Sequence, residues 1–375
     1  MRLSKPLLLS QVVLWAVSAG VGGEPTLEEI RVAPEGRGFV LFPSGARFVP
    51  WGFNYDHDER SRLLEDYWEM EWPKVAEDFR EMKALGANAV RIHLQLGKFL
   101  KGANEPNPQA LQRLEKLIAL AEGTGLYLNL TGLGCYRKQD VPGWYQALEE
   151  SERWGVQVRF WEEVAARCVG SRAIFCYDLM NEPVVAGGKR SAGDWLGPPF
   201  GEFHFVQFIT LDPRGRRRPE IARAWINTLT RAIRRVDPRG LVTVGLVDWS
   251  LDRPGLTSGF VPAAVAPELD FLSVHIYPES GKLDEAVVTL EEFAAVGKPV
   301  VIEETFPLKC GVAEFRRFLD RSRPHAAGWF GFYWGKSPEE LRRSGTIADH
   351  MMLGSLELFR ELAPSIAKAG LDPSD

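Results

Sequence analysis

Two spacings of hydrophobic residues alternate along the chain. In one kind of segment, apolar residues recur three and four positions apart, which is typical of amphipathic helices. In the other they form a short, nearly continuous run, which is typical of a strand buried on both faces. The short runs predict eight strands, at residues 49–54, 88–94, 126–132, 173–180, 241–247, 270–277, 298–305 and 326–335. The helical spacing predicts the intervening and closing helices, at 72–86, 108–125, 153–169, 220–238, 283–297, 310–322 and 351–362, with a short helical turn at 260–267.

This regular alternation predicts the fold. Strands that alternate with helices form a parallel sheet, and eight such units predict that the sheet closes. We therefore expect an α/β protein with a (β/α)8 TIM barrel as a single catalytic domain over residues 25–370. An open doubly wound sheet is the alternative, but no Gly-rich phosphate-binding loop follows the first strand.

Two segments fall outside the repeat. Residues 38–50, "GFVLFPSGARFVP", alternate and turn at 43–45, which predicts a short N-terminal β-hairpin. Residues 184–218 form the longest stretch without regular periodicity, directly after the fourth strand. A loop of that length in a compact domain is usually functional.

The N-terminus has the pattern of an export signal. Arg2 and Lys5 precede an apolar run at 7–17, and small residues follow at 18–20. This order predicts a signal peptide over residues 1–20 and a secreted or periplasmic protein without membrane attachment after its removal. An uncleaved membrane anchor is the alternative, although the run is short for a membrane span.

Composition narrows the classes of partner. The 375-residue chain is 45% hydrophobic and 25% charged, with a net charge of −5 and a pI near 5.8. Nothing in this balance indicates binding to nucleic acid or to an anionic membrane. We also expect a monomer. The four cysteines, Cys135, Cys168, Cys176 and Cys310, match no zinc spacing, and we expect no essential disulfide.

The candidate chemistry lies at the predicted strand ends, where the loops of such barrels gather. Polar and aromatic residues end strands two, four, six, seven and eight: Arg91, His93, Asn181, Glu182, His275, Tyr277, Glu303, Glu304 and Trp334. Strands four and seven lie across the ring from each other, so a Glu on each would face the other over the barrel end. Such a pair supplies the acid and the charged partner that glycoside hydrolysis requires. We expect no metal and no cofactor, because no metal-ligand spacing is present.

The ordered set of Arg91, Asn181-Glu182-Pro183, "SVHIYP", "KPVVIEETF" and Trp334 resembles glycoside hydrolase family 5 and its clan A relatives, over residues 51–334. The resemblance implies a hydrolase in which Glu182 is the acid/base and the strand-seven Glu is the nucleophile. It also implies that Asn181 binds the sugar 2-hydroxyl and that Trp334 lies under the sugar. Arg91 and Tyr277 would keep the nucleophile ionised, and His275 would shape the site. We group Arg91, Asn181, His275, Tyr277 and Trp334 as the substrate-binding set.

Two adjacent glutamates compete for the nucleophile role. Successive side chains of a strand point to opposite faces, so only one of Glu303 and Glu304 can face the barrel axis. In the family the nucleophile follows Lys-Pro by several apolar residues, and counting from Lys298-Pro299 gives Glu304. Relatives also often carry a His after strand three, where this chain has "LNLTGLGCY", so the surroundings of Asn129 and Tyr136 should differ.

The sequence therefore predicts a retaining glycoside hydrolase that acts on a mannan, a β-glucan or their oligosaccharides. A transglycosylase with the same residues, a non-catalytic carbohydrate-binding barrel and a metal-dependent barrel hydrolase are the alternatives. Aromatic rings stack well on sugar C–H faces. We expect two of five loop tryptophans to contact sugar: Trp51, Trp68, Trp144, Trp195 and Trp249.

Overall fold

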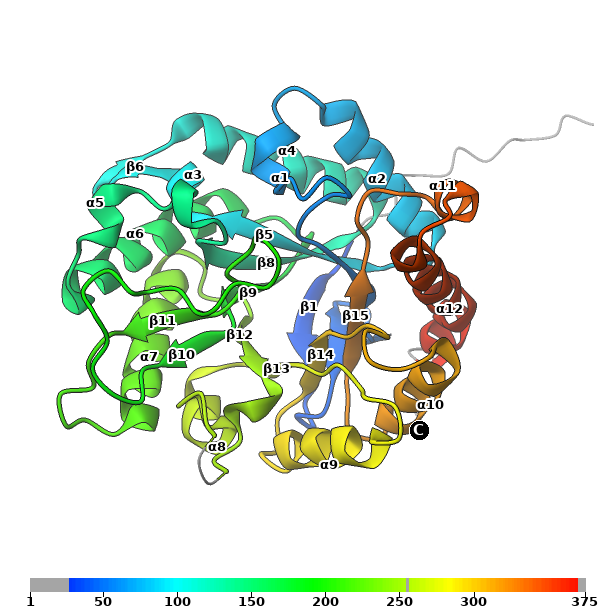
Figure 1. Cartoon of the computed structure of the whole chain (residues 1–375). Helices are drawn as coiled ribbons and strands as arrows, with labels where there is room; N and C mark the ends of the chain where they lie inside the picture. Colours follow the sequence, from blue (N-terminus) through cyan, green and yellow to red (C-terminus); the bar gives the residue numbers. More distant parts are fainter. Residues whose placement is uncertain (1–26, 254–255, 370–375) are drawn as a thin grey trace, which may run out of the picture.

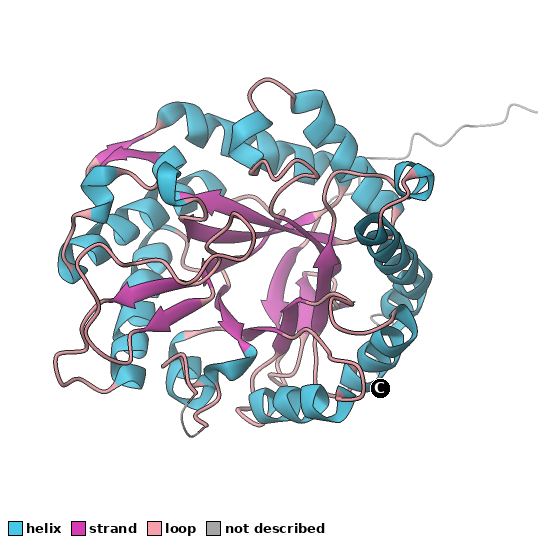
Figure 2. Ribbon diagram, viewed as in Figure 1, coloured by secondary structure: helices cyan, strands magenta, loops and turns pink. Residues whose placement is uncertain are grey.

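The computed structural model describes residues 27–253 and 256–369. Its centre is a closed barrel of parallel strands, drawn inside a ring of helices (Figures 1 and 2). The barrel strands are β4 (Trp51–Tyr55), β5 (Ala89–Gln95), β8 (Tyr127–Gly134), β9 (Ile174–Asn181), β12 (Val242–Val247), β13 (Leu272–His275), β14 (Val300–Glu304) and β15 (Gly328–Phe332). Pairing between β9 and β12 completes a ring in which every strand neighbours the next in sequence and β15 returns to β4. The predicted (β/α)8 barrel is confirmed, and the open sheet is excluded.

The helices of the outer ring follow the predicted order. They are α2 (Trp72–Ala84), α4 (Pro108–Thr124), α6 (Glu150–Cys168), α7 (Arg218–Val236), α8 (Pro262–Val265), α9 (Leu283–Ala294), α10 (Val312–Ser322) and α12 (Ile347–Ala369). Each presents one apolar stripe to the barrel, as Phe79 and Met82 do on α2 and Trp225 and Leu229 do on α7. Burial of these stripes stabilises the helices more than intrinsic propensity does.

Short elements fill the connections between barrel strands and helices. The short helices are α1 (Leu64–Tyr67), α3 (Leu96–Phe99), α5 (Gly143–Gln146) and α11 (Pro338–Arg343), and the 3₁₀ turns are Lys138–Asp140, Asp248–Ser250 and Ala266–Glu268. A small antiparallel pair joins β6 (Leu100–Gly102) to β7 (Glu105–Pro106). A parallel pair joins β10 (Pro183–Val185) to β11 (Gln207–Thr210). The prediction that residues 184–218 lack regular structure was therefore wrong at 184–185 in β10, at 207–210 in β11 and at 218, where α7 begins.

The predicted N-terminal hairpin is present, formed by β2 (Phe39–Phe42) and β3 (Arg47–Phe48), and β1 (Glu29–Val32) extends it to three strands. Phe39 packs edge-on against Phe175 and Phe271, at ring-centre distances of 5.1 Å. Because Phe175 and Phe271 lie where β9 and β13 begin, this sheet covers the amino-terminal end of the barrel. The carboxyl-terminal strand ends are left for the functional groups.

The predicted signal peptide at 1–20 lies outside the described residues. Within the described part of the chain, no helix combines the length and apolarity needed to cross a membrane. All four cysteines are free thiols; three are buried, and Cys310 is half-buried.

Candidate active site

Glu182 follows β9 directly and has a backbone φ of +46°. A non-glycine residue in this left-handed region carries a conformational cost, and such residues concentrate at functional sites. The conformation is held by two backbone hydrogen bonds, from Glu182 N to Gly245 O at 2.9 Å and from Gln207 N to Glu182 O at 3.3 Å. The side chain keeps 17% of its surface exposed. A strained backbone conformation at Glu182 therefore places its carboxylate where it is accessible from the cleft.

Glu304 ends β14 and is held at both carboxylate oxygens. Arg91 Nη1 donates to Oε1 at 2.6 Å, and the Tyr277 hydroxyl donates to Oε2 at 2.5 Å. Burial raises the pKa of Glu304 above its ordinary value and the nearby Glu182 adds to this, whereas His275, Arg91 and the Tyr277 hydrogen bond act in the opposite direction. Two donors on one carboxyl group favour its ionised, accepting form.

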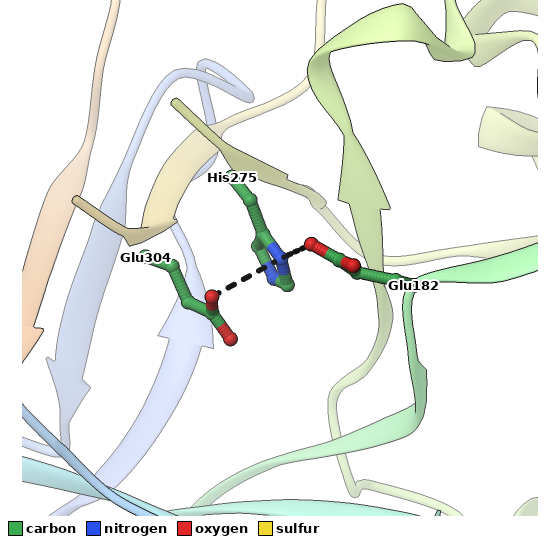
Figure 3. Close-up of side chains that lie close together, drawn as sticks. All are labelled: Glu182, His275 and Glu304. Atoms are coloured by element: carbon green, nitrogen blue, oxygen red, sulfur yellow. Dashed lines mark hydrogen bonds and ion pairs between the residues drawn. The ribbon is translucent and has the colours of Figure 1, made fainter. Parts of the chain in front are cut away.

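His275 lies between the two carboxylates (Figure 3). Its Nδ1 is 3.0 Å from Glu182 Oε1 and 3.5 Å from Glu304 Oε2. Burial alone would lower the pKa of His275, but the charge of Glu304, the hydrogen bond to Glu182 and the nearby carboxylate of Glu303 raise it to about 10. These neighbours favour the imidazolium form of the ring.

One ligand atom from each of Glu182, His275 and Glu304 lies within 4.8 Å of the others. Within the described part of the chain, these three side chains are close enough together to bind one metal ion. Both oxygens of Glu304, however, already accept hydrogen bonds from Arg91 and Tyr277, and Glu182 is bonded to His275. The arrangement therefore fits acid–base chemistry better than a metal centre.

The remaining predicted residues separate into two environments. Arg91 is fully buried and binds Glu304, Asp178 and Asn181, so it supports the carboxylates and has no surface for a sugar. Asn181 is also buried; its Oδ1 accepts from Arg91 at 3.0 Å, and its Nδ2 donates to Phe205 O at 3.2 Å. Tyr277 and Trp334, by contrast, line the cleft. His93 lies in the interior, where its Nδ1 and the Tyr136 hydroxyl are 2.6 Å apart.

Glu303 and Glu304 lie in different surroundings. Glu304 lines the cleft, whereas Glu303 is completely buried in the barrel interior, where Asn129 Nδ2 lies 2.5 Å from its Oε1. Only Glu304 can therefore reach a molecule in the cleft.

The cleft has two lobes that meet at Glu182, Tyr277, Phe200 and Leu308. The first lobe, about 490 Å³, contains Glu304 beside Asp56 and His57 and has a largely apolar wall of Phe203, Phe205, Val206, Phe306, Phe332 and Trp334. The second lobe, about 640 Å³, is more polar and is lined by Asp248, Trp249, Arg253, Glu279, Lys282 and Lys309. Glu182 borders both lobes, and Glu304 borders only the first.

Two features of the first lobe were missed from the sequence. Asp56 Oδ2 pairs with His57 Nδ1 at 2.8 Å, and Asp56 Oδ1 accepts from Trp334 Nε1 at 3.3 Å. Asp56 directly follows β4, so the strand-end rule that found the other residues would also have found it. The phenylalanines of residues 200–205 gave no such signal, because their position depends on how the loop folds back over the barrel.

Among the five loop tryptophans, only Trp249 lines a lobe of the cleft. Trp51, Trp68 and Trp195 are buried, and Trp144 packs against the core. We expected two of these five tryptophans to contact sugar, and only Trp249 is placed to do so. The cleft also contains Trp334, which is not one of the five.

Comparison with known proteins gives one family. The model of Cellulase (glycosyl hydrolase family 5) matches residues 52–329 of this chain. A curated relative, mannan endo-1,4-beta-mannosidase A from Emericella nidulans, is 24% identical over 238 residues, which cover 57% of this chain and 53% of that protein. This chain thus spans about half the length of the curated relative it matches.

Solved structures share the fold at low identity. The exo-beta-1,4-mannosidase Op5Man5 from Opitutaceae bacterium strain TAV5 has a TM-score of 0.66 and 17% identity, over 91% of this chain and 63% of that one. The endo-1,4-beta-mannanase from Rhizomucor miehei has a TM-score of 0.61 and 18% identity, over 91% and 99%. Identities this low support the barrel fold alone.

Proposed function

This chain belongs to glycosyl hydrolase family 5, and from that premise we propose that it is a retaining β-glycosidase acting on a mannan, a β-glucan or their oligosaccharides. The observation that carries the proposal is the separation of the two cleft carboxylates. One oxygen of Glu182 lies within 4.8 Å of one oxygen of Glu304. Carboxyl groups about 5–5.5 Å apart are typical of retaining enzymes, whereas inverting enzymes need about 6.5–9.5 Å to admit a water between acid and base.

The proposed reaction has two steps. First, Glu304 attacks the anomeric carbon while Glu182 gives its proton to the glycosidic oxygen, so the carbon–oxygen bond to the leaving group breaks and a glycosyl ester forms on Glu304. Next, Glu182 takes a proton from a water that attacks the same carbon, which releases Glu304 and restores both carboxyl groups. Tyr277 and Arg91 hold the carboxylate of Glu304 in place for the attack.

The two lobes suggest how the substrate lies. The sugar that becomes linked to Glu304 must sit where that carboxylate is accessible, which is the first lobe, over Trp334. The leaving group then extends past Glu182 into the second lobe. A cleft that continues on both sides of the carboxylate pair suits an oligosaccharide better than a single sugar.

Mannan is the leading substrate in this proposal, because the curated relative is a mannan endo-1,4-beta-mannosidase. The test is hydrolysis of mannan and β-glucan oligosaccharides, with the anomeric configuration of the first product read by ¹H NMR before mutarotation. We expect the β-anomer to appear first. Initial formation of the α-anomer would rule out the retaining mechanism.

The same experiment separates the alternatives. Products longer than the substrate would identify a transglycosylase, since a sugar then captures the glycosyl ester in place of water. Binding without any product from either glycan would favour a carbohydrate-binding barrel. Loss of activity after exhaustive chelation would identify a metal-dependent hydrolase, whereas we expect activity to persist.

We also propose that the protein is exported and acts as a monomer. The support for export is the charged, apolar and small-residue order of residues 1–20. N-terminal sequencing of the protein expressed in a secreting host, together with its mass in solution, tests both statements.

A further inference from the structure

The buried carboxylate of Glu303 has no part in the reaction proposed above. Its side chain is 0% exposed, and it lies one residue before Glu304 on β14. An ionisable group in a barrel interior costs free energy unless charged or hydrogen-bonded partners compensate. The partners of Glu303 therefore indicate what it does.

Three groups surround the Glu303 carboxylate. Asn129 Nδ2 lies 2.5 Å from Oε1, and Arg91 Nε lies 3.6 Å from the same oxygen. The other oxygen, Oε2, lies 3.8 Å from His275 Nε2. Within the described chain, neither Glu303 Oε2 nor His275 Nε2 has a hydrogen-bond partner. Each is therefore available for an ion pair with the other.

The backbone of β12 makes room for this contact. A Cβ atom on Gly245 would lie 3.0 Å from His275 Nε2 and 3.3 Å from Glu303 Oε2. Because position 245 is glycine, the imidazole and the carboxylate can both pack against the strand. The pairing is thus built into two elements of the barrel, β13 and β14, and accommodated by a third.

His275 consequently has a carboxylate at each end of its ring. Nδ1 faces Glu182 at 3.0 Å, and Nε2 faces Glu303. A neutral imidazole has one N–H, so one of its nitrogens would present a lone pair to a carboxylate oxygen. When both carboxyl groups are ionised, only the imidazolium offers a proton to each of them.

We propose that Glu303 is a positioning residue that keeps His275 doubly protonated and holds its Nδ1–H against Glu182, beside Glu304. The charge on His275 then favours the ionised form of Glu304, which is the form that attacks. The inference rests on the proposed roles of Glu182 and Glu304, but it concerns the protonation state of His275, which can be observed without turnover.

Other charged groups also act on His275, and the test has to separate them. They are Glu182 after β9, Glu304 on β14, Arg91 and His93 on β5, and Asp248 after β12. Asp178 provides a matched control: like Glu303 it is a fully buried carboxylate and binds Arg91, at 2.7 Å, but its other partners are Thr131 and the Gly245 amide. It therefore shares the burial and the arginine but not the contact with His275.

The experiment is ¹⁵N NMR of the full chain with labelled histidine, in which imidazolium and the two neutral tautomers give distinct ring-nitrogen shifts. The chain has six histidines, and a His275→Asn variant assigns the signals of interest. In the wild-type protein we expect His275 to remain imidazolium between about pH 5 and 8. In Glu303→Gln its midpoint should fall by at least about one pH unit, the scale expected when a neighbouring charge is removed. Asp178→Asn should leave His275 protonated over the same range.

A second measurement keeps the proposal testable if the Glu303 variant does not fold. Glu182→Gln alters only the accessible partner of His275, and we expect the ring to remain imidazolium at neutral pH because Glu303 is still present. A neutral His275 in Glu182→Gln would overturn the proposal. So would an unchanged titration in Glu303→Gln, or an equal shift in Glu303→Gln and Asp178→Asn.

Kinetics complete the test. Since Glu303 does not reach the cleft, Glu303→Gln should lower kcat roughly 10-fold or more while KM changes little, and Glu303→Asp, which keeps the charge, should recover part of the loss. If neither Glu182 nor Glu304 proves to be needed for turnover, the proposed function fails, yet the NMR result still decides the protonation claim.

Discussion

The hydroxyl of Tyr277 donates a 2.5 Å hydrogen bond to Oε2 of Glu304, the carboxylate oxygen that Arg91 leaves free. Tyr277 comes from the loop after β13 and Glu304 ends β14, so adjacent parallel strands bring the two side chains together. The bond fixes the orientation of a carboxylate that must attack along one direction. A nucleophile held in this way has little freedom to lose on reaction.

Tyr277→Phe removes this bond and leaves the ring in place. Hydrogen bonds to charged groups contribute about 1.5–3 kcal/mol, so we expect kcat to fall roughly 10- to 100-fold with little change in the thermal midpoint. Tyr145→Phe is the control, since the Tyr145 hydroxyl bonds Gln157 at 2.9 Å, and Tyr145 lies outside both lobes of the cleft. Equal activity of Tyr277→Phe and the wild-type protein would show that the bond plays no part in turnover.

Glu182→Ala should stop hydrolysis only where a proton is needed. For oligosaccharides we expect kcat to fall by about 10²- to 10⁴-fold, the usual contribution of general acid catalysis. A dinitrophenyl glycoside, whose leaving group needs no proton, should still form the glycosyl ester, and added azide should then release a β-glycosyl azide. Glu304→Ala should instead give the α-azide, because azide would take the place of the nucleophile. The opposite pair of products would exchange the two assigned roles.

Phe200 is 68% exposed at the junction of the two lobes. An aromatic ring there can stack on the sugar that follows the cleavage point. Phe200→Ala should therefore raise KM several-fold for oligosaccharides and leave kcat for a small aryl glycoside unchanged. Met70→Ala is the matched control, as Met70 is 87% exposed and lines neither lobe. A KM that is equal for both variants would exclude Phe200 from binding.

The buried Glu65 should make the free energy of unfolding depend on pH, independently of catalytic activity. Its Oε1 accepts from Gln95 N at 2.7 Å, and burial raises the pKa of the carboxyl to about 7. Because the folded state binds this proton more tightly than the unfolded state, the contribution is present at acidic pH and is lost as pH rises through about 7. In Glu65→Gln the amide oxygen can still accept from Gln95, and nothing ionises.

Urea unfolding at about pH 5 and pH 8 measures the effect. From pH 5 to pH 8, the free energy of unfolding of the wild-type protein should fall more than that of Glu65→Gln. The difference should be at most about 3 kcal/mol. The exposed Glu77 offers a control, since Glu77→Gln should track the wild-type protein at both pH values. Parallel behaviour of all three proteins would show that Glu65 is not the group responsible.

Much of this architecture could be read from the sequence because each barrel strand is a short apolar run that ends in polar residues. That pattern alone locates β9 with Asn181 and Glu182 and β14 with Glu303 and Glu304. Period-two alternation also implied that the two glutamates of β14 point apart. It did not show where each would lie. A register irregularity between β13 and β14 pairs His275 with Glu304, and only the assembled barrel brings Asn129 to Glu303.

Side chains that meet through folded loops could not be predicted. Whether a tryptophan is buried in the core or exposed to stack on a sugar depends on which side chains pack over it. Trp195 is buried, whereas Trp249 borders the cleft. The apolar wall formed by Phe203 and Phe205 likewise arises from the way residues 186–206 return to pair β10 with β11. Periodicity carries no information about such returns.

The most direct test of the central claim, a double displacement through Glu304, is covalent trapping. The protein is incubated with 2-deoxy-2-fluoro derivatives of β-mannosyl and β-glucosyl fluoride, which slow both steps and let the ester accumulate, and the labelled peptide is sequenced by mass spectrometry. We predict one sugar per chain, attached to Glu304, with Glu303 unmodified. A sugar found on Glu303 or Glu182 would contradict the account, as would full turnover of these reagents with inversion and no adduct.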